Sequence, residues 1–196
     1  MTLFHRILTA LGVLIAALLL AAGSAWWLVL HPPSAHGIAI GPWRSSSDIG
    51  SEHAGMYLRA NVAVTGLFAL NRSEAIYFFA GTDDSGTPLE ARCTYAIEGT
   101  PVAARWWSIT AYGDDNFLIP NAANRFSFNM GTLDPGADGR FKLTAAPSEQ
   151  PGAWLPTGGG TGGFNLTFRI YNAAPAVLAR IGDIALPSIK RVGGCT

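Results

Sequence analysis

Two segments of this chain carry aromatic, hydroxyl and amide side chains, and one guanidinium, at alternate positions. Alternate residues of a β-strand point to the same face of a sheet. Residues 106–112 and 164–171 both show this alternation, and the positions between are apolar. One face therefore carries Trp106, Ser108, Thr110 and Tyr112 in the first segment, and Asn165, Thr167, Arg169 and Tyr171 in the second.

If the two strands lie close together, these side chains line a cleft with aromatic walls and a single positive charge. Such a cleft suits a small carboxylate or a sugar-like ligand. We add Asp114 and Arg125 to this predicted ligand-binding site. The alternative is structural: the same residues would form the outer face of a sheet, or a packed aromatic layer in which Arg169 has a salt-bridge partner.

Few of the residues that hydrolases and metal sites use are present. His5 precedes the apolar N-terminal segment, His31 lies at its edge, and His36 falls in a predicted linker. A Ser-His-Asp or Cys-His enzyme would therefore depend on His53, and a His-rich metal site cannot be assembled. We predict neither a metal nor a cofactor. If the protein is an enzyme, the sequence does not identify its catalytic residues.

Adjacent carboxylates occur twice, at Asp83-Asp84 and at Asp114-Asp115. Acid–base catalysis needs two carboxyl groups that face each other across a substrate. Both pairs lie in predicted turns, where Asp is favoured because its side chain hydrogen-bonds to the nearby backbone. We therefore interpret both pairs as turn residues.

The charges of the chain are balanced, with thirteen basic and thirteen acidic residues and a formal net charge of zero. A nucleic-acid-binding surface needs clustered Lys and Arg to neutralise phosphates, and no such cluster occurs in the sequence. We therefore exclude nucleic acid as a partner.

No charged residue occurs between Ile7 and Leu30. At about 1.5 Å per residue, a helix of this length can cross a hydrocarbon core of about 30 Å. Arg6 favours an N-terminus inside the cell. We therefore predict a single-pass bacterial protein of the inner membrane whose main domain is periplasmic. The predicted divisions are a cytoplasmic flank at 1–6, a transmembrane helix at 7–30, a linker at 31–50 and an extracytoplasmic β-rich domain at 51–196.

The alternative for the apolar segment is a cleaved signal peptide that ends at the small residues 22–25. Cleavage after Ala25 would leave Trp26 and Trp27 at a new N-terminus. Trp favours the membrane–water interface, which suits the outer end of an uncleaved anchor.

The sequence after the apolar N-terminal segment predicts one mainly β domain with one or two flanking helices. Residues 51–70 have helical spacing of apolar residues, and 175–184 could form a second, short helix. The predicted strands cover residues 75–79, 92–97, 106–112, 116–119, 125–129, 140–145 and 164–171. Short strands separated by turn-forming residues are typical of an antiparallel β-sandwich or jelly roll.

Cys93 and Cys195 are the two cysteines of the chain. Outside the cytoplasm they could form one disulfide, which would stabilise the fold by about 2–4 kcal/mol. Two free thiols are the alternative. Two widely separated cysteines do not make a zinc site.

Several sequence blocks, most of them aromatic, resemble one bacterial family. They are Tyr57–Ala60, Glu74–Phe78, Arg105–Tyr112, Phe117–Asn121, Asn124–Ser127, Trp154–Pro156 and Phe168–Tyr171. In order and spacing they are similar to the domain of unknown function 1214, over about residues 50–192. The resemblance implies a jelly-roll-like domain, often the C-terminal half of longer proteins beside the domain of unknown function 1254. Here a membrane segment stands in place of that partner, and the family offers no catalytic residues to transfer.

Three functions stay open from the sequence. The first is a small-ligand-binding or envelope-accessory module that uses the aromatic–Arg face. The second is an enzyme on a small or envelope-derived substrate, with Asp114 as carboxylate and Arg125 or Arg169 for electrostatic stabilisation. The third is docking on another membrane or envelope protein, for which an exposed apolar patch is expected.

Overall fold

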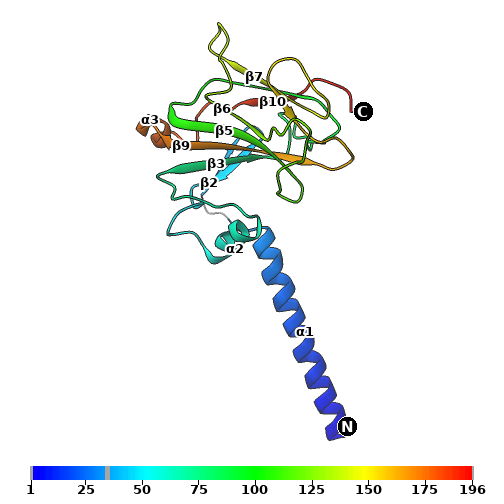
Figure 1. Cartoon of the computed structure of the whole chain (residues 1–196). Coiled ribbons are helices and arrows are strands. Elements are labelled where there is room, and N and C mark those ends of the chain that lie inside the picture. Colours follow the sequence, from blue (N-terminus) through cyan, green and yellow to red (C-terminus); the bar gives the residue numbers. More distant parts are fainter. Residues whose placement is uncertain (1, 34–35, 196) are drawn as a thin grey trace.

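The computed structural model describes residues 2–33 and 36–195. Within them the chain is mostly β, with two sheets, two short helices and a long N-terminal helix that projects from the rest (Figure 1). The predicted mainly β fold with flanking helices is confirmed.

The larger sheet is antiparallel, with strand order β1-β2-β3-β9-β5-β6. Its strands are β1 (Gly37–Ile40), β2 (Trp43–Ser46), β3 (Ala75–Ala80), β5 (Ala104–Gly113), β6 (Ser127–Asn129) and β9 (Phe164–Ala173). Strand β9 lies between β3 and β5, with Trp106 opposite Tyr171 and Thr110 opposite Thr167. The two segments with alternating polar residues are therefore neighbours.

The smaller sheet has the strand order β10-β4-β7-β8. Its strands are β4 (Tyr95–Gly99), β7 (Phe141–Ala146), β8 (Trp154–Pro156) and β10 (Ser188–Arg191). Strands β7 and β8 are parallel, because the loop at 147–153 returns the chain to a point beside Thr144. This one parallel pair departs from the predicted antiparallel arrangement.

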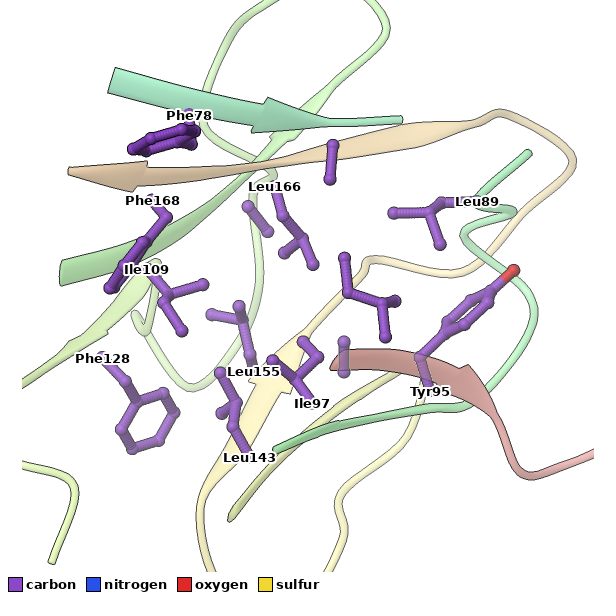
Figure 2. Close-up of a cluster of buried hydrophobic side chains, with 14 of the residues drawn as sticks. Phe78, Leu89, Tyr95, Ile97, Ile109, Phe128, Leu143, Leu155, Leu166 and Phe168 are labelled. Carbon is purple, nitrogen blue, oxygen red and sulfur yellow. The ribbon is translucent and has the colours of Figure 1, made fainter. Parts of the chain in front are cut away.

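The two sheets pack around one hydrophobic core. Figure 2 shows Phe78 and Phe168 from the larger sheet facing Leu143 and Leu155 from the smaller one. The apolar residues between the alternating polar ones fill this core: Trp107, Ile109, Ala111, Phe164, Leu166, Phe168 and Ile170 are all buried. The predicted division of β5 and β9 into two faces is thus confirmed, and the polar residues lie on the outer face of the larger sheet.

Strands β1 and β2 occupy residues predicted to be a linker. Trp43 of β2 is 1% exposed and packs against Phe168 with ring centroids 6.0 Å apart. Its indole Nε1 donates a 2.7 Å hydrogen bond to the carbonyl of Pro187. The linker prediction is wrong over 37–46, because one large aromatic side chain anchors two four-residue strands in a segment rich in Pro, Gly and Ser.

The helices are α1 (Leu3–Leu30), α2 (Met56–Val64) and α3 (Pro175–Ala179). Helix α2 is shorter than the helix predicted over 51–70. It ends at Val64, with Thr65 as its C-cap, and Gly66 follows with a φ of 68°, a left-handed conformation that commonly terminates helices. The strand predicted at 116–119 is reduced to an isolated bridge between Tyr112 and Leu118.

Candidate functional site

Arg169 lies in the middle of the outer face of the larger sheet. It stands opposite Ser108 of β5 and Tyr77 of β3. Its side chain runs diagonally along β5: Nη1 donates to Thr110 Oγ1 over 3.2 Å, and Nη2 donates to Tyr112 Oη over 2.7 Å. The guanidinium carbon lies 5.3 Å from the centre of the Tyr112 ring. Two hydroxyl groups and one aromatic ring therefore fix the position of this cation.

All of these partners are uncharged. Within residues 2–33 and 36–195, Arg169 makes no ion pair, whereas Arg92 pairs with Glu90 at 2.7 Å. Arg169 is half-buried, and Thr110 and Thr167 beside it are buried. A guanidinium partly removed from water and lacking a counter-ion favours the binding of an anion.

A cleft lies over this face, between the sheet on one side and α2 with its following loop on the other. A part of about 70 Å³ reaches Arg169 and Tyr112. A part of about 250 Å³ reaches Leu58 and Val62 under α2. Both parts are lined by Thr65, Leu67, Phe79, Asn116 and Asn165, so we treat them as one cleft.

The two ends of this cleft differ in chemistry. The Arg169 end carries a cation and the Tyr112 hydroxyl, whereas the α2 end is lined mostly by apolar side chains that include Ile49, Leu58 and Val62. Among the described residues, no Asp or Glu lines either part. The cleft can therefore hold a molecule with one anionic group and one apolar part.

The loop that forms the roof of the cleft is fixed to the sheet. The Tyr77 hydroxyl of β3 accepts a 2.9 Å hydrogen bond from the backbone N–H of Leu70. Tyr77 is only 3% exposed, so this part of the outer face is covered. The outer face is thus partly a packed layer and partly the floor of a cleft.

Four residues of the predicted site share this face but do not line the cleft: Trp106, Ser108, Thr110 and Tyr171. Trp106 and Tyr171 lie opposite each other toward the far end of the strands. Burial raises the pKa of Tyr171, although the nearby Arg169 charge opposes this effect. The Tyr171 phenol is therefore neutral at physiological pH and supplies no second charge.

Asp114 and Arg125 lie elsewhere. Exposed Asp114 accepts a 2.7 Å hydrogen bond from the backbone N–H of Gly163, which joins the loop after β5 to the start of β9. Arg125 donates to the carbonyl of Trp154 over 3.1 Å and lies 5.5 Å from the centre of the Phe128 ring. Neither residue lines the cleft, because contacts within and beside their own loops direct both side chains.

His36 belongs to the folded domain, contrary to the sequence-based expectation. Its Nδ1 lies 3.1 Å from Asp48 Oδ1. His36, His53, Asp48 and Arg72 line a separate, open groove on the surface. His53 is therefore not the only histidine of the domain, although both imidazoles are exposed.

Four residues that the sequence did not indicate line both parts of the cleft: Thr65, Leu67, Phe79 and Asn116. Phe79 follows Tyr77 by two positions in β3, so the alternation rule could have placed it on the same face. The other three lie in loops, where no periodic pattern indicates the direction of a side chain.

Two further features bear on where the protein works. Cys93 and Cys195 form a disulfide, which ties the C-terminal tail to the segment before β4. Helix α1 is long and apolar enough to cross a membrane, as judged by length and composition. Its last turn contacts α2, where the Asn61 side-chain amide donates a 3.0 Å hydrogen bond to the carbonyl of Val29.

Together, the fold and the cleft define a β-rich, two-sheet domain that follows a long apolar helix. Residues 74–175 match the family described as "Protein of unknown function (DUF1214)", over more than half of the chain. The chain belongs to this family, which confirms the resemblance inferred from the sequence blocks.

The solved structures that are similar to this chain include the following two. The VPA0106 protein from Vibrio parahaemolyticus is 27% identical, with a TM-score of 0.57, over 71% of this chain and 36% of that one. An uncharacterised protein from Burkholderia cenocepacia is 16% identical, with a TM-score of 0.42, over 61% of this chain and 29% of that one. The chain thus spans about a third of the length of each. No curated protein matches it.

Proposed function

We propose that this protein is a membrane-anchored, periplasmic module that binds a small ligand with an anionic group and an apolar part. The observation that carries the proposal is Arg169, a half-buried cation without a charged partner among the described residues, in a cleft whose other end is mostly apolar.

The chemistry of the ligand follows from the two ends of the cleft. A carboxylate can accept two parallel hydrogen bonds from a guanidinium, and a partly desolvated guanidinium makes such bonds strong. The Tyr112 hydroxyl accepts a bond from Arg169, so its own proton is free to be donated to the same anion. The apolar part of the ligand would fill the space beside Leu58 and Val62.

The periplasmic location is supported by three observations. Helix α1 supplies an anchor, Arg6 favours an N-terminus inside the cell, and the Cys93–Cys195 disulfide suits an oxidising compartment. The same arrangement fits an envelope-accessory role in which the bound ligand is part of, or derived from, the cell envelope.

Native mass spectrometry of the full chain, extracted from membranes in mild detergent, tests this proposal. We expect an added mass that is lost on denaturation and belongs to an organic acid. Arg169→Gln should lose this mass, whereas Arg140→Gln, in an exposed loop before β7, should keep it. A wild-type chain that carries no added mass and also binds no added decanoate contradicts the proposal.

A further inference from the structure

We propose that α2 and the loop after it rest on the lipid bilayer and form a second membrane-contacting surface beside α1. The surface, which we call the α2 patch, consists of Met56, Val64, Phe68 and Leu70. The inference rests on the anchoring role proposed for α1, and it does not depend on the ligand of the cleft.

The contact between α1 and α2 sets the height of the patch relative to the membrane. Val29 lies in the last turn of α1, just after Trp26 and Trp27, and tryptophan favours the membrane–water interface. Asn61 of α2 is hydrogen-bonded to the Val29 carbonyl. Figure 1 shows α2 beside the end of α1, between that helix and the sheets. Helix α2 therefore lies at the level of the interface.

The residues of the α2 patch are apolar and unusually exposed for a soluble surface. Phe68 is 96% exposed and Met56 is 75% exposed, and Val64 and Leu70 are also exposed. Single exposed apolar residues are common, but several in one short segment mark a surface that meets a partner or a membrane. We infer that lipid covers the α2 patch, because the bilayer that surrounds α1 lies next to the patch.

A charged loop lies on the opposite side of the domain. The loop before β7 lies far from α1 in Figure 1 and carries Asp134, Asp138 and Arg140, all of them exposed. The exposed apolar residues of the α2 patch thus lie next to the anchor, and a charged loop lies away from it, as expected of a domain that rests on a membrane.

The position of the patch also bears on the cleft. Leu67 lines the cleft, and Phe68 directly follows it in the patch. A bilayer in contact with Phe68 would bring the apolar end of the cleft close to lipid.

Fluorescence quenching in vesicles tests the inference. Phe68→Cys in the full chain is labelled with a nitrobenzoxadiazole fluorophore and reconstituted into vesicles of phosphatidylethanolamine and phosphatidylglycerol. Nitroxide-labelled lipid is the membrane quencher and iodide is the aqueous quencher. Ala137→Cys, in the exposed loop before β7, is the matched control, and Leu14→Cys in α1 reports insertion.

We expect lipid nitroxide to quench the label at 68 at least twofold more than the label at 137, with iodide showing the reverse order. A label at 14 that is quenched, together with labels at 68 and 137 that respond alike, overturns the inference but leaves the anchor intact. A label at 68 shielded from both quenchers also overturns it, in favour of a protein partner. If the label at 14 is not quenched by lipid, the anchoring role itself fails, and the inference fails with it.

Discussion

Arg169 of β9 donates a 2.7 Å hydrogen bond from Nη2 to the phenolic oxygen of Tyr112 on the neighbouring strand β5. Residues 57 positions apart in the sequence thereby fix one cation over the outer face of the sheet. The bond is diagonal, since the register places Arg169 opposite Ser108. This geometry leaves Arg169 without a charged partner in the described chain and makes it the centre of the proposed anion site.

The Tyr112 hydroxyl is expected to position Arg169. Tyr112→Phe removes one hydrogen-bond partner of the guanidinium and one donor to the ligand, so decanoate affinity should fall about 3- to 10-fold, equivalent to roughly 1 kcal/mol. Titration calorimetry of the full chain in nanodiscs measures this loss. Tyr57→Phe on α2, outside the cleft lining, is the control and should keep the wild-type affinity. Equal affinity of wild type and Tyr112→Phe would refute the positioning role.

The sequence predicted the two faces of β5 and β9 but could not establish their contact. Alternation with period two is a local pattern, and it correctly separated Trp107 and Phe168 in the core from Thr110 and Arg169 outside. The pairing of β5 with β9 depends on contacts between distant segments, which no local pattern contains. The structure supplies that pairing and, with it, the proximity of Arg169 to Tyr112.

Three parts of the structure differ from the sequence-based predictions for physical reasons. Strands β1 and β2 have no periodic pattern that indicates strands, because their stability comes from the buried Trp43. Asp114 and Arg125 were placed in the site by residue type alone, although their loops direct them to Gly163 and Trp154. The roof residues Thr65 and Leu67 follow a helix that ends earlier than its apolar spacing indicated.

The disulfide is expected to stabilise the domain strongly. Cys93 and Cys195 are 102 residues apart, and the cross-link removes chain entropy from the unfolded state. Reduction should lower the free energy of unfolding by about 2–4 kcal/mol. Thermal unfolding of the full chain with and without reductant measures this change, and the Cys93→Ala/Cys195→Ala variant should not respond to reductant. An unchanged unfolding temperature of the wild type in reductant would contradict this prediction.

Asp83 is expected to make stability depend on acid pH. Burial raises the pKa of this carboxyl, but hydrogen bonds from Ser85 and Thr87 and the charge of Arg191 outweigh it and hold the pKa below its usual 3.8. The folded state therefore favours the ionised form. Its contribution is present above the unfolded-state pKa and is lost as pH falls through the lower, folded-state pKa.

Asp83→Asn should consequently lower the free energy of unfolding by about 1–3 kcal/mol at pH 7. The difference from wild type should shrink as the pH falls below about 4, where the carboxyl of the unfolded wild-type chain begins to take up a proton, and should be lost once the folded-state carboxyl is protonated as well. Denaturant unfolding at several pH values measures both effects, with exposed Glu149→Gln as the control. A gap between Asp83→Asn and wild type that stays constant from pH 7 to strongly acid pH would count against the role of the Asp83 charge.

The most direct test of the anion site compares two probes of equal chain length, decanoate and decanol, by titration calorimetry with the full chain in nanodiscs. Empty nanodiscs supply the background, because both probes partition into lipid. Arg169→Gln loses hydrogen bonds to a charged ligand, each worth about 1.5–3 kcal/mol, so its decanoate affinity should fall at least about 10-fold. Arg140→Gln should match wild type, and decanol should bind wild type and Arg169→Gln alike. Saturable decanoate binding that is equal in wild type and Arg169→Gln, or no binding above background, would contradict the account.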